Sequence, residues 1–214
     1  MSQLEKYDRL SAAFSNHEYG DPAAYHRRRA EVVAEIEPRL EPGDRVLDLA
    51  CGDAGMAVPL LERGFEYVGV DASTGMVAAA RERVGGRVPI EHGTIDGYGP
   101  PEPVAATICF RAFYYAVDRR AFFAHVATYT RKKLVFDVSP RRFSVDEVLA
   151  DLRAAGYERV VLQPFFLPQR HRVPRVLAAV LRRVERTPRL ARAVLRVHGI
   201  LIVSASASSA RTRN

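Results

Sequence analysis

Between residues 45 and 163 the sequence alternates short apolar runs with amphipathic stretches, and this alternation restricts the fold more than any other feature. The apolar runs are continuous, which is typical of strands in a parallel sheet that helices cover on both faces. The alternation therefore predicts an α/β protein with a doubly wound, mostly parallel seven-stranded sheet and helices on both faces. The expected strands are 45–49, 67–71, 88–92, 104–110, 133–138, 157–163 and 198–208. The expected intervening helices are 54–63, 73–84, 119–130 and 145–155.

The segments outside this alternation are helical in pattern. Asp21-Pro22 predicts an N-cap followed by proline in the first helical turn, starting a helix over 22–40. We divide this single domain into an N-terminal helical segment (1–40), an α/β core (41–167), a basic amphipathic helical insertion (168–197) and a last strand with a tail (198–214). Because the last strand follows a helical connection, we expect it to be an edge strand or an antiparallel insertion.

The net charge of +7 is distributed unevenly along the chain. Residues 168–214 hold eleven arginines and one acid, Glu185, so the basic character belongs to the C-terminal part. Such a surface can bind nucleic acid or anionic lipid, but an arginine-rich solvated face is the simpler interpretation. We therefore expect no nucleic-acid partner, and we leave peripheral contact with a membrane open.

Cysteine usage and apolar segments indicate the compartment. Cys51 and Cys109 are the only cysteines, and neither lies in a CxxC or Cys/His cluster. We expect no disulfide and no metal site, and therefore a reduced, cytoplasmic environment. The N-terminal segment MSQLEKYDRL is too polar for a signal peptide, and no stretch approaches the ~20 apolar residues of a membrane span.

The stretch VLDLACGDAG at 46–55 places two carboxylates around a glycine-rich loop. A loop that binds pyrophosphate presents backbone N–H groups, and Asp48 and Asp53 beside Gly52 would repel phosphate and favour a cation. Nineteen residues after Gly52, Asp71 ends the second strand, where a carboxylate can accept both hydroxyls of a ribose. The pattern thus indicates a cationic nucleoside without phosphate, which S-adenosylmethionine satisfies.

VLDLACGDAG and the following YVGVDASTGMVAAAR resemble motifs I and II of the class I (Rossmann-like) S-adenosylmethionine-dependent methyltransferases. The resemblance covers roughly residues 30–165 and implies S-adenosylmethionine as cofactor and S-adenosylhomocysteine as product. We expect the N-terminal helical segment to fold over the cofactor as a lid. It implies that Asp48 orients the methionine end, Asp71 holds the ribose, and Ala72 and Met76 line the adenine. The full set of cofactor-binding residues that we expect is Asp48, Ala50, Cys51, Gly52, Asp71, Ala72, Met76, Thr94, Ile95, Phe110 and Arg111.

The chain departs from the family pattern at three positions. Thr94 stands where the family usually has an acid beside adenine, so the Ile95 backbone N–H or Asp96 would have to serve. Ala50 and Ala54 replace the first and third glycines of the loop. Alanine is tolerable at these positions if its φ stays negative. We expect Asp53 to cap the helix that follows.

The sequence gives fewer signals for the methyl acceptor than for the cofactor. Methyl transfer needs a general base only if the acceptor must lose a proton, and the sequence displays no catalytic dyad, so the sequence does not identify a catalytic residue. The turn FRAF at 110–113 lacks the [N/D]PP[Y/F] motif of amino-methylating nucleic-acid enzymes, which favours a small organic acceptor, methylated at oxygen or carbon and possibly biosynthetic. The expected substrate residues are Tyr19, Tyr25, Tyr114 and Tyr115.

The N-terminal segment contains two further candidate site residues, and two alternative functions are compatible with the sequence. Arg29 could meet the methionine carboxylate. His26 could act as a base, although a histidine beside three arginines is expected at the surface. An RNA or protein methyltransferase that uses the basic C-terminal region stays an alternative. A relative that binds the cofactor without turnover, or an NAD-dependent oxidoreductase, is another, although the two loop carboxylates argue against NAD.

Overall fold

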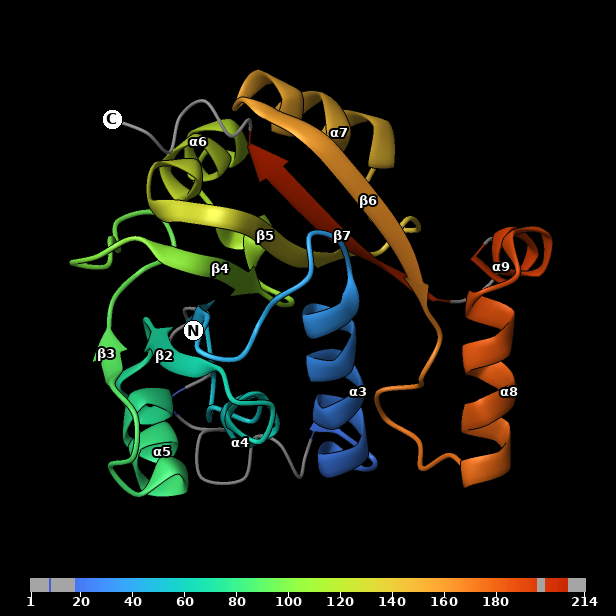
Figure 1. The fold of residues 1–214 in the computed structure, drawn as a ribbon, viewed down its shortest axis with the longest axis horizontal. Coiled ribbons are helices and arrows are strands. Elements are labelled where there is room, and N and C mark those ends of the chain that lie inside the picture. The colour runs from blue at the N-terminus through green and yellow to red at the C-terminus, as the bar shows by residue number, and fades with distance from the viewer. Residues whose placement is uncertain (1–7, 9–17, 196–198, 208–214) are drawn as a thin grey trace.

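The computed structural model describes residue 8 and residues 18–195 and 199–207, and the expected tail after 207 lies outside this range. A seven-stranded sheet in the order β3-β2-β1-β4-β5-β7-β6 forms the centre of the molecule (Figure 1). Every strand pair from β3 across to β5 is parallel, and β7 runs antiparallel to both of its neighbours. The strands are β1 (Arg45–Leu49), β2 (Glu66–Asp71), β3 (Ile90–His92), β4 (Val104–Cys109), β5 (Thr130–Val138), β6 (Tyr157–Phe165) and β7 (Ile200–Ala207).

Helices cover both faces of the sheet, as predicted. Alternate residues of β1 enter different cores: Val46 packs with the helices of one face, and Leu47 and Leu49 pack with those of the other. The first face carries α3 (Pro22–Glu35), α4 (Ala57–Leu61) and α5 (Thr74–Val84), and the second carries α6 (Arg119–Tyr129) and α7 (Val145–Ala154). A 3-10 turn, η2 (Phe113–Tyr115), follows β4, and α8 (Arg175–Glu185) and α9 (Pro188–Leu195) lie beside the sheet beyond α3 (Figure 1).

The last strand is an antiparallel insertion, so the alternative that it forms an edge is wrong. β7 pairs with β5 on one side and with β6 on the other, which leaves β6 at the edge. The sequence carries a reason for this order. Pro164 lies in β6 and has no N–H to donate, and strands that contain proline are largely confined to sheet edges.

Capping residues fix several helix ends. Asp21 accepts a hydrogen bond from the Ala24 N–H at 3.0 Å and starts α3, as predicted. The helix ends at Glu35 and not at residue 40, because a residue that precedes proline disfavours helical φ and ψ, and Pro38 follows closely. Ser73 caps α5 through the Met76 N–H, and Gly85 ends that helix at φ 58°. Within the described residues, no helix is long and apolar enough to span a membrane.

Candidate active site

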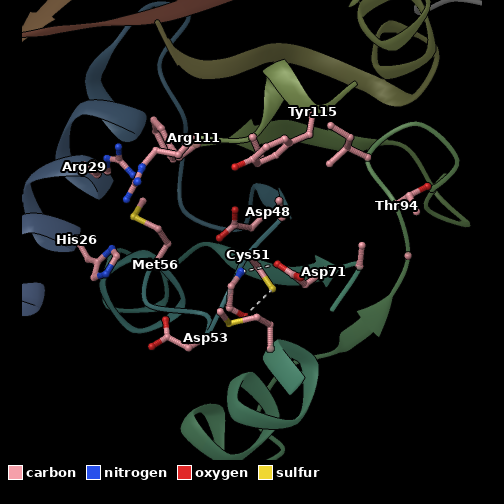
Figure 2. A pocket seen from close by; sticks show the side chains of 18 of the residues that line it. His26, Arg29, Asp48, Cys51, Asp53, Met56, Asp71, Thr94, Arg111 and Tyr115 are labelled. Carbon is pink, nitrogen blue, oxygen red and sulfur yellow. Dashed lines mark hydrogen bonds between the residues drawn. The ribbon is translucent and has the colours of Figure 1, made fainter. Parts of the chain in front are cut away.

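A cavity of about 400 Å³ lies at the carboxyl ends of β1, β2 and β4, where the sheet order reverses. Residues of α3 and of the segment just before it form one wall, so the N-terminal part closes the cavity from that side (Figure 2). All eleven residues that we expect to bind the cofactor line this cavity, and so do the expected substrate residues Tyr19 and Tyr115. They are Asp48, Ala50, Cys51, Gly52, Asp71, Ala72, Met76, Thr94, Ile95, Phe110 and Arg111.

The Asp71 carboxylate is held in place by the backbone. Its Oδ2 accepts a hydrogen bond from the Gly52 N–H at 2.8 Å, and its Oδ1 accepts one from the Ser73 N–H at 2.9 Å. Each carboxylate oxygen can accept more than one hydrogen bond, so both retain capacity for a ligand hydroxyl. The nineteen-residue spacing from Gly52 thus joins the glycine loop to the tip of β2.

Asp48 is a buried carboxyl on the floor of the cavity, 3% exposed. The Tyr67 hydroxyl donates a hydrogen bond to its Oδ2 at 2.8 Å. Burial raises the pKa of Asp48 to about 7, a rise that the hydrogen bond from Tyr67 opposes and the charge of Asp71 increases. A cation in the cavity would favour the ionised form of this carboxyl.

Asp53 does not cap the helix that follows it, so this expectation is wrong. The helix α4 begins at Ala57, three residues later than predicted, and its N-cap residue, Met56, makes no side-chain cap. Asp53 pairs instead with Arg83 of α5, whose Nη2 lies 2.6 Å from the Asp53 Oδ2. An ion pair at this point offsets one of the two loop charges.

The two alanines that replace loop glycines adopt left-handed backbone conformations. Ala50 has a φ of 58° and Ala54 a φ of 55°, contrary to the condition of a negative φ. Each such residue costs roughly 1–2 kcal/mol, because its Cβ crowds the following carbonyl oxygen. The loop therefore keeps the glycine geometry and stores strain, which is common where a backbone must approach a ligand.

The turn after β3 uses its side chains locally. The Thr94 hydroxyl accepts a hydrogen bond from the Gly97 N–H at 3.2 Å, and the Asp96 carboxylate accepts one from the Val117 N–H at 3.3 Å. Both residues line the cavity together with Ile95. Asp96 is therefore a cavity carboxylate that also ties this turn to the segment after η2.

His26 is buried in the cavity wall, and the expectation that it lies at the surface is wrong. It is 7% exposed, and neither ring nitrogen has a hydrogen-bond partner in the described part of the chain. Burial, followed by the charge of Arg29, lowers the pKa of His26 to about 4, so the imidazole is neutral at pH 7. A Cβ on Gly55 would come within 2.4 Å of the His26 Nε2, so only glycine leaves room for the ring.

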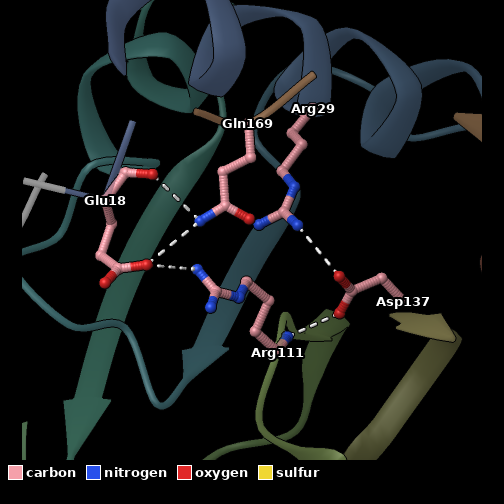
Figure 3. Close-up of polar contacts among 5 residues, drawn as sticks. All are labelled: Glu18, Arg29, Arg111, Asp137 and Gln169. Atoms are coloured by element: carbon pink, nitrogen blue, oxygen red, sulfur yellow. Dashed lines mark hydrogen bonds and ion pairs between the residues drawn. The ribbon is translucent and has the colours of Figure 1, made fainter. Parts of the chain in front are cut away.

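A polar network that includes the cavity residues Arg29 and Arg111 joins the N-terminal part to the segment after β4, the end of β5 and the segment after β6 (Figure 3). Arg29 on α3 donates through Nη2 to the Asp137 Oδ2 at 3.0 Å, and the Arg111 N–H donates to the Asp137 Oδ1 at 2.6 Å. The side chain of Arg111 reaches Glu18 at 3.4 Å, and the Gln169 amide donates to the Glu18 carbonyl at 3.2 Å. Sequence reasoning missed Asp137, although its position at the carboxyl end of β5 is a signal for a site residue.

The other two expected substrate residues line a second cavity. Tyr25 and Tyr114 border a space of about 340 Å³ that Arg111 also borders, so the two cavities adjoin at Arg111. Arg111 has a φ of 58°, an unusual conformation for a residue other than glycine.

Burial raises the pKa of the Cys51 thiol well above 9, which keeps the thiol protonated and unsuited to nucleophilic attack.

Comparison with known proteins places this site in a family context. A family model described as a methyltransferase domain matches residues 46–133, from the glycine loop to β5. An uncharacterized methyltransferase of Geobacillus kaustophilus, GK2543, is 30% identical over 115 residues, which make up 53% of this chain and 51% of the relative. The chain spans about half or less of the length of the first curated relatives that it matches.

Two solved structures share the fold over most of both chains. The [4+2]-cyclase SpnF matches with a TM-score of 0.67 at 18% identity, over 95% of this chain and 94% of that chain. Magnesium protoporphyrin IX methyltransferase from Synechocystis PCC 6803, solved with bound SAM, matches with a TM-score of 0.59 at 15% identity, over 97% of this chain and 85% of that chain. At such identities these likenesses show the fold.

Proposed function

We propose that this chain is a class I S-adenosylmethionine-dependent methyltransferase that transfers the methyl group of S-adenosylmethionine to a small organic acceptor, at oxygen or carbon. The observation that carries this proposal is the cavity at the sheet reversal, where Asp48 and Asp71 meet the glycine loop. Its volume of about 400 Å³ falls within the ~300–1,000 Å³ of small-molecule sites.

The residues present fit the cofactor. Asp71 would accept the ribose hydroxyls, since its two oxygens are already oriented by the Gly52 and Ser73 N–H groups. The buried Asp48 suits a ligand that carries positive charge, and Ala50 holds the left-handed geometry that brings backbone close to a ligand. Asp48 and Asp71 lie at the glycine loop, where a dinucleotide would place its pyrophosphate, and negative charge on these carboxyls disfavours that group.

The activity requires the protein mainly to position two reactants. The cofactor supplies a methyl group already activated by its sulfonium, so alignment with the acceptor can lower much of the barrier, by ~7–11 kcal/mol in model reactions. Tyr19, His26 and Arg29 form the cavity wall on the α3 side. This wall would exclude water from the reacting groups, as a lid does. A general base would be needed only for an acceptor that must lose a proton.

The first experiment is calorimetric titration with S-adenosylhomocysteine and, separately, with NAD. We expect micromolar binding of S-adenosylhomocysteine and none of NAD. Asp71→Ala should abolish the binding, because the ribose loses its acceptor. Asp146→Ala, an exposed acid on α7 outside the cavity, is the matched control and should bind as the wild type does. Binding of NAD alone, or of neither ligand, would refute the proposal.

A second candidate acceptor is RNA, and a specific surface favours it. Helices α8 and α9 expose arginines that include Arg182, Arg183 and Arg189. Nucleic-acid binding there would weaken steeply with salt, because each phosphate contact releases counterions. Filter binding of a structured RNA between 50 and 200 mM salt tests this candidate, and binding that does not change with salt would exclude it.

A further inference from the structure

The second cavity lies outside the carboxyl ends of β5 and β6 and is separate from the cofactor site except at Arg111. It is bordered by three arginines, Arg111, Arg141 and Arg142, and by one acid, Asp137. The balance of these charges determines which ligand the cavity can accept.

The single acid is already engaged. Asp137 accepts hydrogen bonds from the Arg29 guanidinium at 3.0 Å and from the Arg111 N–H at 2.6 Å. The side chain of Arg111 also approaches Glu18, but only at 3.4 Å, which is long for a charge-assisted hydrogen bond. Asp137 is therefore directed at Arg29 and at the Arg111 backbone, and it forms no ion pair with Arg142.

Arg142 is held by rings and not by an acid. Its guanidinium carbon lies 5.5 Å from the centre of the Tyr114 ring and 5.7 Å from that of Phe143. Among the residues that the structure describes, no carboxylate lies within ion-pair distance of it. Because the rings contact the face of the planar guanidinium, the N–H groups at its edge remain available to an anion.

Aromatic rings form part of the cavity wall. The Tyr114 and Phe143 rings stack at 5.5 Å with an interplanar angle of 17°, and Tyr25 meets Phe165 edge to face at 5.4 Å. Aromatic rings pair with other rings in offset-stacked or edge-to-face arrangements, so these side chains suit a planar ligand. The cavity thus combines a surface for a planar apolar body with a site for negative charge.

We propose that this second cavity binds the methyl acceptor, and that the acceptor is a small planar molecule with an anionic group such as a carboxylate. The proposal rests on the proposed function, because it assigns the acceptor of the same reaction. The anionic group meets Arg142, which borders only the second cavity, and the opposite end of the molecule reaches the junction at Arg111, next to the cofactor site.

The test compares ligands that differ in charge but little in shape. The protein is first saturated with S-adenosylhomocysteine, and 4-hydroxybenzoate and 3-hydroxy-2-naphthoate are then titrated by calorimetry alongside their neutral amides. We expect each acid to bind about tenfold or more tightly than its amide, as charge-assisted hydrogen bonds are roughly twice as strong as neutral ones.

Two variants locate the effect. Arg142→Gln should lower the affinity for the acids about tenfold and leave the affinity for the amides unchanged. Arg153→Gln, an exposed arginine on α7 outside both cavities, is the matched control and should change neither. Acids that bind no better than amides, acids and amides that both fail to bind, or an acid preference that survives in Arg142→Gln would overturn the proposal. If S-adenosylhomocysteine itself fails to bind, the proposed function fails instead, so the two failures are distinguishable.

Discussion

Arg29 and Asp137 form a buried ion pair that joins the helix before the sheet to the carboxyl end of β5 (Figure 3). The two side chains are 2% and 7% exposed, and the nitrogen–oxygen distance is 3.0 Å. The guanidinium also lies 4.3 Å from the centre of the Phe110 ring and 4.8 Å from that of Tyr25. Arg29 lines the first cavity and Asp137 the second, so this pair belongs to the wall of both.

Removing one partner of this pair should destabilise the fold strongly. We expect Asp137→Ala to lower the free energy of unfolding by about 3–5 kcal/mol, because the Arg29 charge stays buried without compensation. Urea denaturation at pH 7 measures the change. Glu66→Gln, in the exposed pair with Arg45, is the control and should cost less than about 1 kcal/mol. An equal cost for the two variants would contradict the role of the pair.

His26 should contact the amino-acid end of the cofactor. Figure 2 shows His26 and Arg29 on one side of the cavity and Asp71 and Thr94 on the other, so a ligand with its ribose at Asp71 extends its other end toward the unpartnered imidazole. We expect His26→Ala to weaken S-adenosylhomocysteine about three- to tenfold, the contribution of one hydrogen bond.

The control for His26 is a ligand that lacks the amino-acid end. The affinity for 5′-methylthioadenosine, measured by the same calorimetry, should not change in His26→Ala. His171→Ala, outside the first cavity, should leave both affinities unchanged. Equal losses for the two ligands would mean that His26 only supports the fold.

Binding should depend on pH through Asp48. Since its pKa is about 7, Asp48 is mostly protonated at pH 6 and mostly ionised at pH 8, and a ligand ammonium prefers the ionised form. We expect the affinity for S-adenosylhomocysteine to rise up to about tenfold over this range, with proton release detectable by calorimetry in buffers of different ionisation enthalpy. In Asp48→Asn the affinity should be flat with pH, and a slope that persists there would assign the titration to another group.

The same carboxyl should make stability depend on pH in the opposite direction. A pKa that is higher in the folded than in the unfolded state favours the protonated native protein, so the stability that Asp48 contributes at low pH is lost as pH rises through about 7. We expect Asp48→Asn to melt at a higher temperature than the wild type at pH 8.5, with a much smaller difference at pH 5. The asparagine oxygen can still accept the hydrogen bond from Tyr67. A lower melting temperature for the variant at pH 8.5 would contradict this assignment.

Ala50→Gly should stabilise the protein. Relief of the left-handed conformation is worth about 1–2 kcal/mol, and the greater entropy of glycine in the unfolded chain offsets part of it, which leaves a gain of up to about 1 kcal/mol. Thermal unfolding measures the change. Ala79→Gly, at a half-buried helical position in α5, is the matched control and should cost about 1 kcal/mol. A loss of stability in both variants would show that Ala50 is not strained.

Features that depend on neighbours in the chain were predictable from the sequence. The alternation of apolar runs and helices, the caps at Asp21 and Ser73, and the turn at Gly85 are set within a few residues, so propensity and spacing determine them. The nineteen-residue spacing of Gly52 and Asp71 was equally readable, because it spans one helix and one strand whose ends must meet at the same edge of the sheet.

Features that depend on distant packing were decided only by the tertiary structure. His26 carries the sequence signature of a surface residue, and it is buried because α3 packs its face against the loop at Gly55. The partner of Arg29 lies 108 residues away, and the second cavity joins residues from 25 to 200. Local sequence fixes which element forms and where it stops. The packing of the completed helices and strands decides which side chains become buried. It also decides which charged group then pairs with a buried charge.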